Sequence, residues 1–90
     1  LSFLRRHENL EQLDLEGCVG ISDLEPLRGL KGLKSVNLVC CSNLRTIDAV
    51  AGLTELAYVG IGGCEKLEEI PEAMASRPGV VITQFPLYRL

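Results

Sequence analysis

The four cysteines are the residues of this sequence with the clearest chemical potential: Cys18, Cys40, Cys41 and Cys64. Thiolates act as nucleophiles and zinc ligands, and cysteines of small secreted domains pair as disulfides. A zinc site favours close pairs such as C-x-x-C or additional histidines, and the chain has neither a C-x-x-C pair nor a second histidine. Three of the cysteines instead recur every 23 residues, which predicts reduced thiols inside a repeating core.

The other candidate catalytic groups also lack partners. His7 has no nucleophile or metal ligand at an interpretable spacing, so we interpret it as a solvated turn residue. The glycines of "VGIGGC" (59–64) match neither common phosphate-loop pattern. The carboxylates of "EKLEE" (65–69) would need a cleft to act as acid and base, and a solvated loop is the simpler interpretation. We therefore expect no enzymatic activity, no metal and no cofactor.

Composition narrows the classes of partner. The 90 residues carry a net charge of −3 and a pI of about 5.1, so no general positive field attracts nucleic acid. The longest apolar runs span a few residues, far below the roughly 20 that a membrane-spanning helix needs. We expect a protein partner, no nucleic acid and no membrane insertion. Because the sequence begins with Leu1 and not with a methionine, the lack of a targeting peptide says nothing about the compartment. We expect an intracellular location, either cytoplasmic or mitochondrial.

The recurring cysteines close three in-phase copies of one pattern. The copies are "LEQLDLEGC" (10–18), "LKSVNLVCC" (33–41) and "LAYVGIGGC" (56–64), which share the template L-x-x-L-x-L-x-x-C with aliphatic substitutions. Within each copy the apolar residues alternate, as in Leu13-x-Leu15, and this alternation predicts a short strand with one buried face.

After each cysteine the apolar spacing changes to every third residue. In the first copy these residues are Ile21, Leu24, Leu27 and Leu30. Three-residue spacing predicts a tight helical or 3₁₀ return along the opposite side of the core. Ser22 and Glu25 fit a capping box, and Thr46 fits a cap before the equivalent turn of the second copy.

These repeats resemble those of leucine-rich repeat proteins, and the resemblance covers residues 10 to about 76. The stretch "CVGISDL" (18–24) is similar to the cysteine-containing repeats of F-box substrate adaptors, and "CEKLEEIP" (64–71) to those of plant-type immune receptors. The resemblance implies an α/β fold, a short horseshoe arc of a solenoid. Parallel strands would line its concave face and short helical or 3₁₀ segments its convex face. It also places Cys18, Cys41 and Cys64 in a buried ladder that faces loop carbonyls, and leaves Cys40 exposed.

The repeats divide one domain, residues 1–90, into consecutive units. Residues 1–9 fit the tail of a preceding repeat, and the full repeats are 10–32, 33–55 and 56–78. Pro71 and Pro78 bracket an expected helix of about two turns, and "GVVITQF" (79–85) is strand-like. We interpret residues 71–90 as a C-terminal cap.

The residues between the strand anchors should point to the concave face and form the partner-binding surface. They are Gln12, Asp14 and Glu16 in the first copy, Ser35, Asn37 and Val39 in the second, Tyr58 in the third, and Thr83 and Phe85 in the last strand. Gly60 and Gly62 would leave this face shallow and open. Tyr58 is the best single anchor, and the acidic first copy favours a basic segment of the partner.

The function expected from these features is a non-enzymatic protein-interaction module or scaffold, part of a larger chain or complex. Two narrower roles compete with it. One is a structural subunit or assembly factor of a larger complex, for which a mitochondrial complex is one candidate. The other is the substrate-recognition part of a ubiquitin-ligase adaptor.

Overall fold

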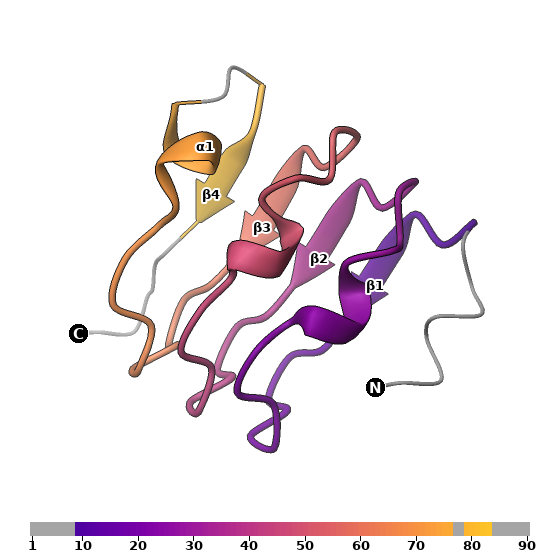
Figure 1. Ribbon diagram of the computed structural model, residues 1–90. Coiled ribbons are helices and arrows are strands. Elements are labelled where there is room, and N and C mark those ends of the chain that lie inside the picture. The colour runs from indigo at the N-terminus through magenta and orange to yellow at the C-terminus, as the bar shows by residue number, and fades with distance from the viewer. Residues whose placement is uncertain (1–8, 77–78, 84–90) are drawn as a thin grey trace.

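The computed structural model describes residues 9–76 and 79–83. Within them, parallel strands form one sheet in chain order, β1 (Gln12–Asp14), β2 (Ser35–Asn37), β3 (Tyr58–Gly60) and β4 (Val81–Thr83). The return segments contain two 3₁₀ turns, η2 (Glu25–Leu27) and η3 (Asp48–Val50), and one helix, α1 (Glu72–Ala75). Figure 1 shows these helical segments lined up over one face of the sheet. The result is a short two-layered α/β arc, which confirms the expected fold class.

Each strand pairs with the next at an offset of 23 residues. Leu13 lies opposite Val36, Val36 opposite Val59, and Val59 opposite Ile82. Side chains equivalent in the repeat therefore stack in rows about 4.8 Å apart, the spacing of neighbouring strands. In this register Ile82 points toward the core, and Val81 and Thr83 lie on the opposite face.

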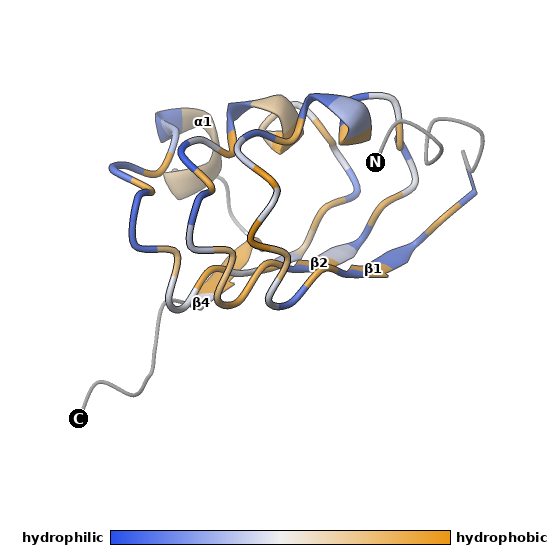
Figure 2. Cartoon of the chain, turned by 90° about the horizontal axis from the view of Figure 1, so that it is seen from below, coloured by the Kyte–Doolittle hydropathy of each residue, from blue (hydrophilic) through white to orange (hydrophobic). Residues whose placement is uncertain are grey.

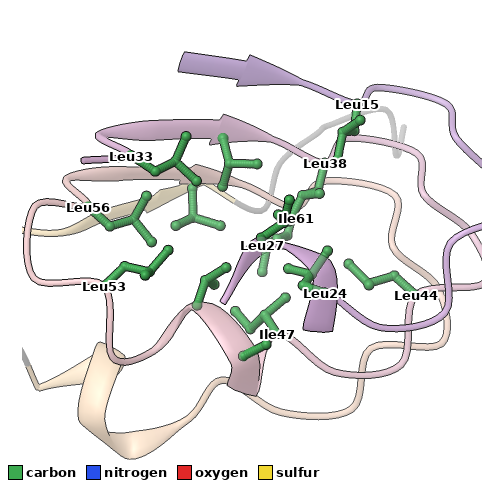
Figure 3. Packing of buried hydrophobic residues seen from close by; sticks show 14 of the residues in the cluster. Leu15, Leu24, Leu27, Leu33, Leu38, Leu44, Ile47, Leu53, Leu56 and Ile61 are labelled. Carbon is green, nitrogen blue, oxygen red and sulfur yellow. The ribbon is translucent and has the colours of Figure 1, made fainter. Parts of the chain in front are cut away.

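The core lies between the sheet and the helical turns, and aliphatic rows fill it. Leu15, Leu38 and Ile61 follow one another along the stack in Figure 3, and all are buried. Leu24, Leu27, Leu30, Leu33, Val36 and Leu44 are fully buried. Figure 2 shows the sheet and the helical turns as two layers, and removing the apolar side chains between them from water stabilises the arc.

The three-residue spacing of the returns has a hydrogen-bonding cause. The amide of Leu27 donates to the carbonyl of Leu24, that of Leu30 to Leu27, and that of Leu33 to Leu30, at 2.9 to 3.0 Å. These are bonds from residue i+3 to residue i, as in a 3₁₀ helix, so every third side chain faces the same way. The buried face of the return is therefore set by this backbone path.

The predicted caps and the predicted helix length need correction. Ser22 does not cap η2: the Glu25 amide instead donates to Asp23 Oδ1 at 2.9 Å, and Leu24 takes the N-cap position. Thr46 does bond the first turn of η3, with its Oγ1 accepting from the Asp48 amide at 3.0 Å. The expected two-turn helix is a single turn that starts directly after Pro71.

A left-handed residue precedes each ladder cysteine, a feature that the sequence analysis missed. Gly17, Cys40 and Gly63 have φ values of 77°, 63° and 79°, and they lie 23 residues apart. Glycine adopts this conformation without steric cost, whereas a residue with a Cβ is strained by about 1–2 kcal/mol. The middle repeat therefore carries strain at Cys40 that its neighbours avoid.

We predict that Gly17→Ala lowers the free energy of unfolding by about 1 kcal/mol, because an alanine Cβ is strained at this φ. Apart from the two chain neighbours, no atom of the described structure lies within 4 Å of the added Cβ, so the change creates no clash with the rest of the fold. Gly29→Ala is the matched control, since Gly29 is equally open without a positive φ. Cys40→Gly should raise the same free energy by about 0.5 kcal/mol. Urea denaturation measures all three, and equal losses in Gly17→Ala and Gly29→Ala would refute the strain argument.

Candidate functional site

The candidate binding surface is the open face of the sheet, the face turned away from the core and the helical turns. We define it by the described residues that the sequence assigned to it: Gln12, Asp14, Glu16, Ser35, Asn37, Val39, Tyr58 and Thr83. Phe85 was also assigned to this face and lies outside the described residues. The in-register pairing brings the assigned residues into neighbouring rows, with Ser35 between Gln12 and Tyr58.

Hydrogen bonds fix the polar side chains at the β1–β2 end of the open face. Asp14 Oδ1 accepts from the Glu16 amide at 3.0 Å, and Asn37 Oδ1 accepts from the Val39 amide at 3.0 Å. The Asn37 side-chain amide donates to Glu16 Oε1 at 3.3 Å, which links the end of β2 to the segment that follows β1. These bonds reduce the number of conformations that the two carboxylates can adopt before a partner arrives.

Tyr58 dominates the other end of the open face. Its hydroxyl lies 3.0 Å from Thr83 Oγ1 on β4, within hydrogen-bonding distance. A Cβ added at Gly60 would lie 2.9 Å from the Tyr58 hydroxyl oxygen, so the ring rests on bare backbone. The ring is therefore held in place by Gly60 below it and Thr83 at its tip.

This packing corrects the expectation that Gly60 and Gly62 leave the face shallow and open. Both glycines are buried. Alternation correctly directs Gly60 away from the core, but the Tyr58 side chain lies over it. Glycine at this position therefore provides the space that the ring fills.

Exposed apolar side chains also gather at the Tyr58 end. Tyr58 is 37% exposed and Val81, its register partner on β4, is 55% exposed. Val19, at 55%, is the other large exposed hydrophobic residue in the described part of the chain. Two of these three side chains thus lie side by side on one surface, and Figure 2 shows the hydrophilic colours at β1 changing to hydrophobic ones at β4.

The ladder cysteines serve the core and do not form a reactive site. Cys41 Sγ donates to the Leu15 carbonyl at 3.2 Å, and Cys64 Sγ donates to the Leu38 carbonyl at 3.0 Å. Burial is the main cause that raises the pKa of Cys41 to about 11, and burial also raises the pKa of Cys64. Cys41 is fully buried, whereas Cys18 and Cys64 are half-buried. Of the three cysteines predicted to be buried, only Cys41, in the middle repeat, is therefore fully buried.

The other groups that could do chemistry in the described residues are an exposed thiol and several exposed carboxylates. Cys40 is exposed, as expected, and Glu65, Glu68 and Glu69 project from a solvated loop. His7 lies outside the described residues. No set of three or more possible metal ligands converges in residues 9–76 and 79–83. In the same part of the chain, no helix has the length and hydrophobicity needed to cross a membrane.

Comparison with known proteins gives one partial similarity. Over 65 residues, the chain is 37% identical to "Disease resistance protein RPP2A" from Arabidopsis thaliana. The chain is similar to a plant disease resistance protein. The matched region covers 71% of this chain and 5% of that protein, so the chain spans only a small fraction of its relative. No protein-family model and no solved structure matches the chain.

The partial similarity and the fold support the same coarse relationship. The strands, the 23-residue register and the 3₁₀ returns are those that a leucine-rich repeat resemblance implies. The partial similarity to a plant disease resistance protein agrees with the resemblance of "CEKLEEIP" (64–71) to the repeats of plant-type immune receptors.

The raised thiol pKa values predict a loss of stability at alkaline pH. Folding keeps the Cys41 thiol protonated to about pH 11, whereas the same thiol in the unfolded chain ionises near pH 9. Above pH 9 the unfolded state therefore binds fewer protons, and the free energy of unfolding falls until about pH 11. Cys41→Ser keeps a donor for the Leu15 carbonyl and removes this titration, so its pH dependence should be shallower. Urea denaturation between pH 7 and 11 measures both slopes, and identical slopes would rule out Cys41 as the cause.

Proposed function

We propose that the chain is a non-enzymatic module that binds a protein partner through the open face of the sheet. The main observation is the pairing of Tyr58 and Val81, two exposed apolar side chains that lie next to each other on neighbouring strands. Large side chains that are held rigid lose little conformational entropy on binding, and tyrosine adds a polar tip. A protein surface is the partner that matches this combination.

The distribution of polar groups favours the same conclusion. Beside the apolar pair, Ser35 and Asn37 are half-buried and offer hydrogen-bonding groups, and Asp14 and Glu16 are exposed. An apolar centre with a polar border is the usual arrangement of protein interfaces. The open face thus combines an anchor with groups that select orientation.

The similarity to a disease resistance protein supports a role in recognition within a longer chain or complex. Because the chain corresponds to 5% of that relative, the process it serves is part of the proposal. The two narrower roles, complex assembly and ubiquitin-ligase adaptation, would use the same surface. The identity of the partner distinguishes between them.

Affinity capture from the source cells tests the proposal. The intact chain is compared with the double variant Tyr58→Ala, Asp14→Lys, which removes the aromatic anchor and reverses a charge on the open face. The matched control is Thr54→Ala, Glu55→Lys, which makes the same charge change in the turn ahead of β3. Circular dichroism establishes that each variant is folded, and mass spectrometry identifies the captured proteins.

We expect the open-face variant to lose partners that both the intact chain and the control retain. The affinity should fall by more than about tenfold, because a buried aromatic anchor contributes roughly 2 kcal/mol or more to binding. Retention of every partner by the folded open-face variant would place recognition elsewhere and contradict the proposal.

A further inference from the structure

A hollow on the open face lies between the acidic end and the aromatic end. Its volume is about 290 Å³. Residues of three neighbouring strands line it: Gln12, Leu13, Asp14, Ser35, Asn37 and Tyr58. Because β2 lies between β1 and β3, Asp14 and Tyr58 stand on opposite sides of the hollow. Two strand spacings, about 10 Å, separate these sides, which leaves room for one long side chain.

The acidic side of the hollow carries charge that its neighbours do not neutralise. Within residues 9–76 and 79–83, the ion pairs are Arg28 with Glu25 and Lys34 with Glu11. Asp14 and Glu16 belong to neither pair, and their partners are the neutral amides of Glu16 and Asn37. Two negative charges are therefore fixed at this end, with no cation of the described chain paired to them.

The opposite side offers a fixed aromatic group. Gly60 and Thr83 hold the Tyr58 side chain, which leaves part of the ring exposed at the edge of the hollow. Aromatic rings attract cations, and the attraction is strongest for groups that can also stack, such as a guanidinium. A carboxylate facing an aromatic group across a hollow suits a side chain that is cationic, planar and long.

We propose that this hollow receives an arginine side chain of the protein partner. The proposal rests on the function proposed above and specifies the chemistry of its ligand. A guanidinium can donate to the Asp14 carboxylate while its stem and plane contact Tyr58 on the other side of the hollow. A lysine ammonium satisfies the charge without the stacking, and an apolar side chain would leave the Asp14 carboxylate desolvated without a partner.

The proposal is tested by NMR titration of the full 90-residue chain with N-acetyl-L-arginine amide. The matched probe is the citrulline derivative, which has the same length and shape but carries no charge. Arginine should shift the amide signals of Asp14, Ser35 and Asn37 and the ring signals of Tyr58. Citrulline should bind about tenfold more weakly, because a hydrogen bond to a charged group contributes about 1.5–3 kcal/mol.

Two variants locate the effect. Asp14→Asn keeps the side-chain oxygen that accepts from the Glu16 amide but removes the charge, so arginine should bind about tenfold more weakly. Glu68→Gln removes one charge from an exposed loop that does not line the hollow, and arginine binding should be unchanged. Equal binding of arginine and citrulline would overturn the proposal. Equal weakening by both variants would also overturn it, since it would indicate attraction to net charge alone.

The failure of this inference is distinguishable from failure of the proposed function. A captured partner that is lost with Tyr58→Ala but retained at full affinity by Asp14→Asn would leave the open-face function intact and refute the arginine contact. A partner retained by the open-face double variant would refute the proposed function, and the titration alone would then decide whether the hollow selects arginine.

Discussion

The structure depends on parallel strands that pair at a constant offset of 23 residues. Each strand spans only three residues, so its own hydrogen bonds could not hold it in isolation. Pairing continues past the strand ends: the Leu15 amide donates to the Asn37 carbonyl, and the Leu38 amide donates to the Gly60 carbonyl, at 2.8 and 2.7 Å. These bonds align the aliphatic rows, and the aliphatic rows in turn exclude water from the bonds.

The return path has to repeat as accurately as the strand. A left-handed residue at Gly17, Cys40 and Gly63 turns the chain, and the cysteine that follows each one donates its backbone amide to a carbonyl three residues earlier. Ladder thiols then reach the carbonyls of the preceding repeat, where a larger side chain would not fit among packed neighbours. The thiols of Cys41 and Cys64 act here as small hydrogen-bond donors that link neighbouring repeats.

The sequence alone predicts the features that follow from strict periodicity. The strand positions, the 3₁₀ returns, the buried Cys41 and the inward Ile82 all follow from counting by 23 or by three. Features that depend on a particular neighbour do not follow. Gly60 is buried because the Tyr58 side chain lies over it. Asp23, rather than Ser22, accepts the hydrogen bond from the Glu25 amide. The strain at Cys40 had a signal in the aligned dipeptides "GC", "CC" and "GC", where only the middle repeat lacks glycine.

The stacked rows have a consequence for how such a surface can change. Inward positions keep one kind of residue in every repeat, as in Leu13, Val36, Val59 and Ile82. The outward row beside them holds Gln12, Ser35, Tyr58 and Val81, four side chains with little in common. Backbone pairing does not depend on the identity of the outward side chains, so substitutions there change the chemistry of the open face with little effect on folding. Evolution, or a designer, can therefore change this surface one strand at a time while the scaffold stays the same.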